Sequence, residues 1–122
     1  MRQELPPLNG KMIDTVAHRF RVLGEPQRLR ILQFLQVGPK TVNEVVRELG
    51  TSQPNVSRHL QALFEAGLVA RRRSTTSMIY SVSDPLVFRL CSLVCSSVVE
   101  HARLGLEEMV PSARRRSNRG ER

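Results

Sequence analysis

Residues 41–67 constrain the fold most strongly, because two short helical patterns meet there at a glycine. The first pattern places apolar residues at helical spacing and predicts one buried stripe. Its members are Val42, Val45, Val46 and Leu49. Gly50 follows directly and can adopt the left-handed conformation that ends many helices. Thr51 or Ser52 can then cap a second helix, with Pro54 in its first turn, where the missing N–H costs little.

The second helix is predicted to bury one side and to present polar groups on the other. The predicted buried stripe is Val56, Leu60, Leu63 and Phe64. The predicted outer face is Gln53, Asn55, Ser57, Arg58, His59 and Gln61. Two helices joined by a glycine-containing turn are typical of a helix-turn-helix, whose second helix enters the DNA major groove. The alternative is an ordinary helical hairpin with a solvated face.

Side-chain chemistry suggests how this segment would divide its contacts with double-stranded DNA. Amide, hydroxyl and guanidinium groups pair with base edges and phosphates. We expect Gln53, Asn55, Ser57 and His59 to read bases, and Arg58 and Thr41 to hold phosphates. Ser52, at the start of the helix, belongs to the same predicted interface.

A basic hairpin is predicted to follow the second helix. Residues 68–73 and 78–82 can pair as strands across a loop that lacks the Asn-Gly signal of a tight turn. Arg71, Arg72 and Arg73 alternate between the faces of a strand, so they cannot all reach one phosphate track. We expect one or two of them to contact the DNA backbone and another to be satisfied locally. A solvated run of charge is the alternative interpretation.

The remaining patterns predict a mainly α fold with a small β-hairpin, in the order α-α-α-α-β-β-α. Helices are expected over residues 11–22, 26–37 and 86–109, in addition to the central pair. Residues 1–10 are expected to be a flexible lead, 11–109 the DNA-binding and dimerisation domain, and 110–122 a basic disordered tail. Arg28 projects from the 26–37 helix, where it either reaches a phosphate or pairs with an acid inside the domain.

The last predicted helix carries more apolar surface than so small a domain can cover. Ser83 or Asp84 is expected to cap it, with Pro85 at its first position. A second copy of the chain would bury the apolar surface, with the first helix packed alongside. We therefore expect a homodimer formed through the first and last helices.

Charge and composition favour a nucleic-acid partner. The formal net charge is +8, and the tail from residue 110 supplies about half of it, with five arginines and one glutamate. Only 4 % of the residues are aromatic, which argues against single-stranded nucleic acid as the partner. No apolar run is long enough for a membrane span, and residues 1–11 lack the apolar core of a signal peptide. We expect a cytoplasmic protein.

Three segments resemble the winged-helix repressors of the ArsR/SmtB family. They are residues 23–32 (LGEPQRLRIL), 52–60 (SQPNVSRHL) and 63–69, and the similarity extends over about residues 17–85. The resemblance implies a small bacterial dimeric repressor with a shared winged helix-turn-helix fold. It also implies that the inducer site varies between subfamilies.

Cys91 and Cys95, the two thiols of the chain, lie four residues apart on one face of the last predicted helix. Three interpretations remain open: small residues in a dimer interface, soft ligands for trivalent arsenic or a thiophilic metal ion, and a redox switch. Three sites that the resemblance would imply are missing. These are a cysteine-rich motif near residues 39–44, a His-containing zinc set in the last helix, and a cysteine in the second helix. No cofactor is otherwise indicated.

The sequence therefore predicts a sequence-specific DNA-binding regulator, a repressor that binds an inverted-repeat operator as a homodimer. A thiol-reactive signal at the last helix would release it. The alternatives are a winged-helix protein-interaction module and a ligand-independent repressor with structural cysteines. No P-loop, dinucleotide fingerprint or nucleophile elbow is present, so no enzyme is predicted.

Overall fold

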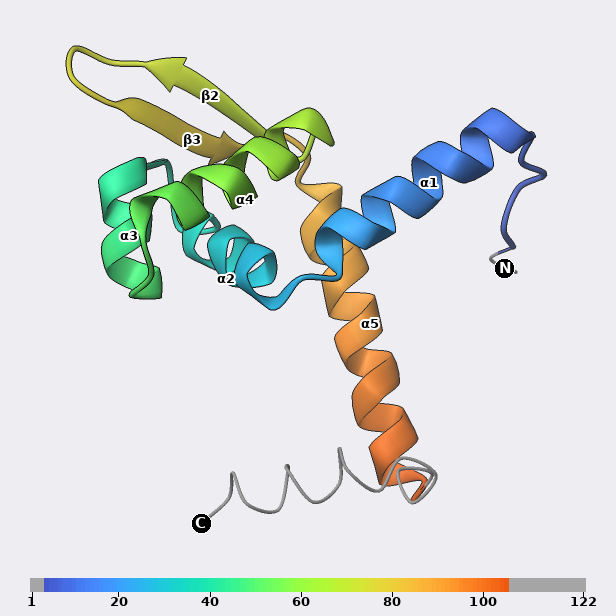
Figure 1. The fold of residues 1–122 in the computed structure, drawn as a ribbon. Helices are drawn as coiled ribbons and strands as arrows, with labels where there is room; N and C mark the ends of the chain where they lie inside the picture. The colour runs from blue at the N-terminus through green and yellow to red at the C-terminus, as the bar shows by residue number, and fades with distance from the viewer. Residues whose placement is uncertain (1–3, 106–122) are drawn as a thin grey trace. The chain divides into compact units, whose positions relative to one another are not determined.

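The computed structural model describes residues 4–105, which form two compact units that divide between Asp84 and Pro85. The first unit contains α1 (Gly10–Leu23), α2 (Pro26–Leu35), β1 (Lys40–Thr41), α3 (Val42–Leu49), α4 (Gln53–Glu65), β2 (Val69–Arg73) and β3 (Met78–Val82). The second contains α5 (Leu86–Arg103) (Figure 1). The predicted mainly α fold with a β-hairpin is confirmed.

The sheet has one strand more than the predicted hairpin. β3 lies in the middle, pairing antiparallel with β2 on one side and with β1 on the other. Lys40 pairs with Tyr80, and Thr41 with Ile79, so the strand immediately before α3 is hydrogen-bonded to the hairpin. This arrangement ties the start of α3 to the base of the hairpin. The sequence did not reveal β1, because a strand of two residues has no periodicity to detect.

Apolar side chains from α2, α3 and α4 form the core of the first unit. The most deeply buried are Ile31, Val45, Val56, Leu60, Leu63 and Leu68. Of the four α4 residues predicted to be buried, Val56, Leu60 and Leu63 have no exposed surface, whereas Phe64 is half-buried. Fixing one side of α4 in this way leaves its other side to face outward.

Side-chain caps fix both helices of the central pair. The Thr41 hydroxyl oxygen accepts a hydrogen bond from the Glu44 N–H (3.2 Å), and the Glu44 carboxylate accepts one from the Thr41 N–H (2.8 Å). This reciprocal pair is a capping box. The hydrogen bond from the Thr41 backbone lowers the pKa of Glu44. Gly50 ends α3 at φ +67°, and the Ser52 hydroxyl then caps α4 (3.3 Å to the Asn55 N–H), as predicted.

Two predicted helix boundaries are wrong. α2 ends at Leu35 rather than at residue 37, before the glycine and proline at 38 and 39. α5 begins at Leu86, as predicted, but Pro85 occupies the N-cap position instead of the first helical position. α5 ends at Arg103, with Leu104 as its C-cap and Gly105 at a positive φ of 76°, rather than at residue 109 as predicted. The predicted basic tail lies outside the described residues.

Much of the apolar surface of α5 is exposed. Its large exposed side chains are Leu86, Leu93, Val94, Val98 and Val99, and Leu104 follows at its end. Within residues 4–105 no helix combines the length and hydropathy needed to cross a bilayer.

Replacing Gly50 with alanine should destabilise the protein by about 1 kcal/mol, because an L side chain is strained in the left-handed region. Gly10→Ala is the matched control. An added Cβ meets nothing within 4 Å at either position, but only Gly50 has a positive φ. Urea denaturation at one fixed protein concentration measures the free energy of unfolding of both variants. Equal stability of the two variants would contradict the assigned helix end.

Candidate nucleic-acid interface

The first turns of α4 present a chain of hydrogen-bonded polar side chains. The Gln53 amide nitrogen donates to the Ser57 hydroxyl (3.0 Å), and the Asn55 amide nitrogen donates to the Thr51 hydroxyl (3.2 Å). The Arg58 guanidinium donates to the Asn55 amide oxygen. These bonds hold short polar groups in defined positions before any ligand arrives.

These side chains differ in exposure. Ser52, Gln53 and Arg58 are exposed, whereas Asn55 and Ser57 are half-buried. Thr41 is also half-buried, and its hydroxyl oxygen is engaged in the capping box of α3. The hydroxyl proton is still able to donate to an external oxygen, because Thr41 acts in that cap only as an acceptor.

The prediction that His59 faces outward is wrong. Its side chain is buried, and it lies between Arg28 and Glu25 of the segment that begins α2. A spacing signal was available, because residue 59 lies three after Val56 and four before Leu63, on the buried side of the helix. Histidine is polar, and for that reason residue 59 is expected on the outer face from the sequence alone. Arg28 also points into the domain rather than toward a phosphate. Its guanidinium donates to His59 and to the Val22 carbonyl, and not to an acidic side chain as one of the two predicted alternatives held.

The hairpin arginines separate into one that is held by α4 and two that are not. Arg71 donates to the Gln61 amide oxygen (2.9 Å), and its guanidinium lies over the Phe64 ring, 3.9 Å from the ring centre. Arg72 and Arg73 are exposed, and within residues 4–105 neither guanidinium has a hydrogen-bond or ion-pair partner. This division agrees with the expectation that one arginine would be satisfied locally.

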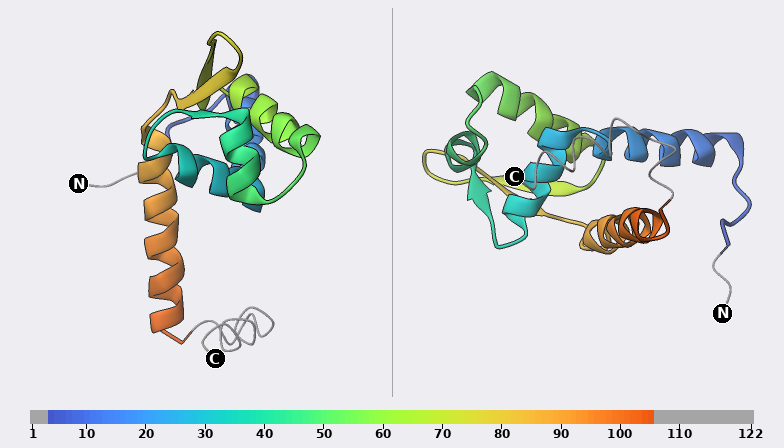
Figure 2. Two further views of the ribbon diagram at one scale, coloured as in Figure 1. Left: turned by 90° about the vertical axis from the view of Figure 1, so that its left-hand side faces the viewer. Right: turned by 90° about the horizontal axis from the view of Figure 1, so that it is seen from below.

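The loop at the end of the hairpin, residues 74–77, is closed by its own serines. The Ser74 N–H donates to the Ser77 carbonyl (2.8 Å), and the Ser74 hydroxyl donates to the same oxygen (3.3 Å). Figures 1 and 2 show this loop at the free end of β2 and β3, away from the helices of the first unit. Arg72 and Arg73 therefore lie on the projecting part of a strand beside α4.

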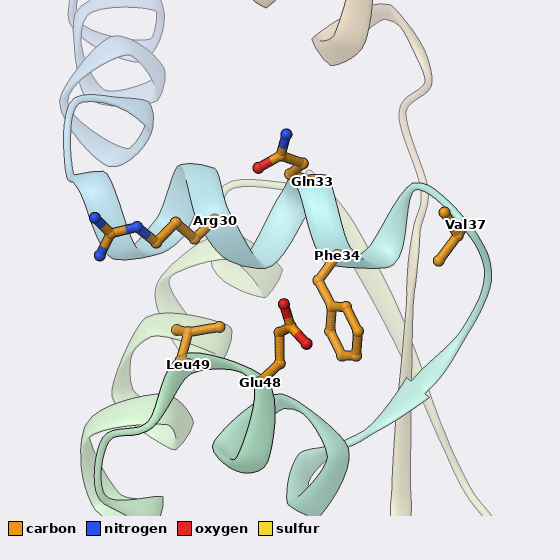
Figure 3. Close-up of a pocket in the computed structure, with 6 residues that line it drawn as sticks. All are labelled: Arg30, Gln33, Phe34, Val37, Glu48 and Leu49. Carbon is orange, nitrogen blue, oxygen red and sulfur yellow. The ribbon is translucent and has the colours of Figure 1, made fainter. Parts of the chain in front are cut away.

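A hollow of about 460 Å³ between α2 and α3 offers a different surface. Arg30 and Phe34 line it from α2, and Glu48 and Leu49 line it from α3 (Figure 3). Because one cation and one anion line it, the hollow does not attract a polyanion as the arginines of the hairpin do.

The thiols of α5 are both reduced, with Cys91 half-buried and Cys95 exposed. Burial raises the pKa of the Cys91 thiol, and the nearby Cys95 acts in the same direction. Within residues 4–105 no three His, Cys, Asp or Glu side chains converge on a point where a metal ion would fit. A cation held by this part of one chain would therefore have at most two such side chains as ligands.

Residues 25–71 match the family model described as "Bacterial regulatory protein, arsR family". A probable mercury resistance operon repressor from Streptomyces lividans is 43 % identical over 89 residues, which cover 73 % of this chain and 71 % of that protein. The chain belongs to the arsR family. Its members are DNA-binding transcriptional regulators, so the polar face of α4 and the projecting hairpin are elements of a winged helix-turn-helix.

Other arsR-family proteins support the same assignment. The HTH-type transcriptional regulator NmtR of Mycobacterium tuberculosis is 36 % identical over 107 residues, 88 % of each chain. The crystal structure of Rv0081 from the same organism superposes with a TM-score of 0.70 at 29 % identity, covering 78 % of this chain and 96 % of that one. A winged helix-turn-helix domain of Mb0332 from Mycobacterium bovis, described as homodimeric, gives 0.69 at 31 % identity, covering 82 % and 93 %.

Removing the Arg71 side chain should lower the free energy of unfolding by about 0.5–1 kcal/mol, because it loses the ring contact and one exposed hydrogen bond. Arg72→Ala, on the neighbouring position of the same strand, should change stability by less than about 0.5 kcal/mol. Urea titration of both variants measures the difference. An equal loss for the two would show that Arg71 is not specifically held against α4.

Proposed function

We propose that this arsR-family regulator is a repressor that inserts α4 into the major groove of its operator. Gln53, Asn55 and Ser57 would contact base edges, while Arg58, Thr41 and Ser52 would contact the sugar-phosphate backbone. The observation that carries the proposal is the one-sided burial of α4, which leaves Gln53 and Arg58 exposed. His59 is no longer proposed as a base reader, because it is buried.

The hairpin would act as the wing of this fold. Arg72 and Arg73 are available for phosphates, whereas Arg71 is engaged by Gln61 and Phe64. Since successive side chains of a strand point to opposite faces, one of the two free arginines would reach the duplex and the other would remain in solvent.

We further propose that the repressor binds as a homodimer to an inverted repeat. The Mb0332 domain is described as homodimeric, and α5 has exposed apolar side chains that a second copy would cover. Two copies related by a two-fold axis would present two α4 helices to successive turns of the major groove, which requires a palindromic operator. In this function the protein acts on chromosomal DNA in the cytoplasm and catalyses no reaction.

Arg58→Ala should weaken binding to a duplex from the protein's own promoter region and flatten its salt dependence by about one unit of log–log slope. Arg30→Ala is the matched control, because Arg30 is also an exposed helical arginine but lines the α2–α3 hollow, whose lining also includes Glu48. The log–log salt dependence of duplex binding should change less in Arg30→Ala than in Arg58→Ala. Fluorescence anisotropy at several salt concentrations measures the affinity of both variants and hence both slopes.

Two outcomes would overturn the proposal. One is a wild-type protein that binds no duplex from its promoter region at low salt. The other is a larger effect of Arg30→Ala than of Arg58→Ala, which would move the interface to the α2–α3 hollow.

A second part of the proposal concerns the signal that releases the repressor. We propose that Cys91 and Cys95 bind a thiophilic ion, such as mercury(II) or trivalent arsenic. The pair is close enough for the two thiols to influence each other, and Cys95 is exposed. Thiolates are the ligands that soft ions select. The relative from Streptomyces lividans is described as a probable mercury resistance operon repressor, which favours mercury(II) as the first probe.

Binding would replace two S–H bonds by two sulfur–mercury bonds and release two protons. Wild-type protein should therefore retain mercury(II) against an excess of a monothiol at least about tenfold better than a displaced-thiol variant, because chelation raises effective concentration. Cys95→Ser/Ser96→Cys provides that control, since it keeps two thiols but turns the second one about 100° around the helix. Equal retention by the two proteins would contradict a shared site.

A further inference from the structure

A polar cluster around the buried His59 joins the proposed recognition helix to the half-buried Glu25 and Arg28. Arg28 Nε donates to His59 Nδ1 (3.1 Å), and His59 Nε2 lies 3.5 Å from a carboxylate oxygen of Glu25. His59 belongs to α4, whereas Glu25 and Arg28 belong to the N-cap and first turns of α2. The imidazole therefore has a hydrogen-bond partner at Nδ1 and a carboxylate within ion-pair distance of Nε2, and both groups come from the segment that begins α2.

The cluster connects three helices of the first unit. The Glu25 carboxylate also caps α2 by accepting from the Gln27 N–H, with both oxygens at 3.2 Å. Arg28 donates in addition to the Val22 carbonyl at the end of α1 (3.4 Å). Polar contacts thus join the last turn of α1 and the first turn of α2 to the middle of α4. Such contacts depend on direction more strongly than apolar contacts do.

The position of His59 along α4 makes these contacts relevant to the outer face. His59 follows Arg58 directly and lies within two turns of Gln53 and Asn55. Because the helix is rigid over this length, a rotation of α4 at His59 displaces all of those side chains together. Readers of base edges need their geometry to be fixed, since a displacement of about 1 Å is enough to lose a hydrogen bond.

The hydrogen bond from Arg28 is compatible with only one protonation state of the histidine. Nδ1 can accept a hydrogen bond from the guanidinium only while it carries no proton itself. Protonation at Nδ1 would remove this acceptor and place two cations at contact distance. We propose that Glu25, Arg28 and His59 form a positioning network for α4, which holds its DNA-contacting face in place only while the His59 imidazole is neutral.

The surrounding charges support the neutral state. Burial lowers the pKa of His59 below its ordinary value of 6.5. Glu25 opposes this change, while Arg28 and Arg58 act in the same direction as burial. The network is therefore intact at neutral pH. The fold favours the neutral imidazole, so the contribution of the network is complete above pH 6.5. This contribution is lost as the pH falls from 6.5 through the lowered pKa that His59 has in the folded protein.

This inference rests on the proposed operator binding, and His59→Asn tests it. The asparagine amide oxygen can replace Nδ1 as an acceptor for Arg28 but does not titrate. Binding of wild type and variant to the same duplex should be similar near about pH 8. As the pH falls through the pKa of His59, wild type should come to bind at least about fivefold more weakly than the variant. Using the variant as the reference removes the effect of all other titrating groups.

A second readout separates positioning from a merely structural role. By linkage, an operator that binds only the neutral form must lower the pKa of His59 further when it binds. NMR titration of the His59 ring, with and without duplex, measures this change. His59→Leu, which keeps a buried side chain but offers no acceptor, should bind more weakly than His59→Asn at every pH.

Three results would overturn the network, and they differ from a failure of the proposed function. These are parallel pH profiles for wild type and His59→Asn, a His59 pKa that the duplex does not change, and equal binding by the leucine and asparagine variants. A wild-type protein that binds no duplex even near about pH 8 would instead contradict operator binding itself, while the NMR titration of the free protein would still report on the contacts of His59.

Discussion

The structure depends on the division of α4 into a buried side and an exposed side. Val56, Leu60 and Leu63 are completely buried and fix both the depth and the rotation of the helix. Each such side chain contributes about 1.5–3 kcal/mol relative to leaving it in water, so rotating this stripe outward would cost much of the stability of a domain this size. The polar side chains opposite it therefore face outward as a consequence of apolar packing.

Polar contacts then define the helix starts and hold α4 in the orientation that apolar packing gives it. The caps at Thr41 and Ser52 define where α3 and α4 begin, and Gly50 permits the tight turn between them. Beneath α4 the Glu25–Arg28–His59 cluster adds directional contacts, and above it Arg71 anchors the hairpin through Gln61 and Phe64. The face of α4 that we propose to meet DNA is thus supported on two sides by interactions that do not themselves involve DNA.

Periodicity was sufficient to predict the helices, the hairpin and the caps of the central pair, because burial imposes a repeat on the sequence. It failed where burial and polarity conflict. His59 occupies a position on the buried stripe, but a histidine there looks like a surface residue until its partners Arg28 and Glu25 are placed. β1 escaped detection because two residues carry no pattern, and the choice among the three arginines of the hairpin depended on the position of the Phe64 ring.

The most direct test is a crystal structure of the protein bound to its operator. The account predicts hydrogen bonds of about 2.7–3.2 Å from Gln53, Asn55 or Ser57 to base edges in the major groove, with Arg58 and a hairpin arginine on phosphates and His59 still bonded to Arg28. A complex in which α4 faces away from the duplex, with the DNA held instead along α2 and α3, would contradict it.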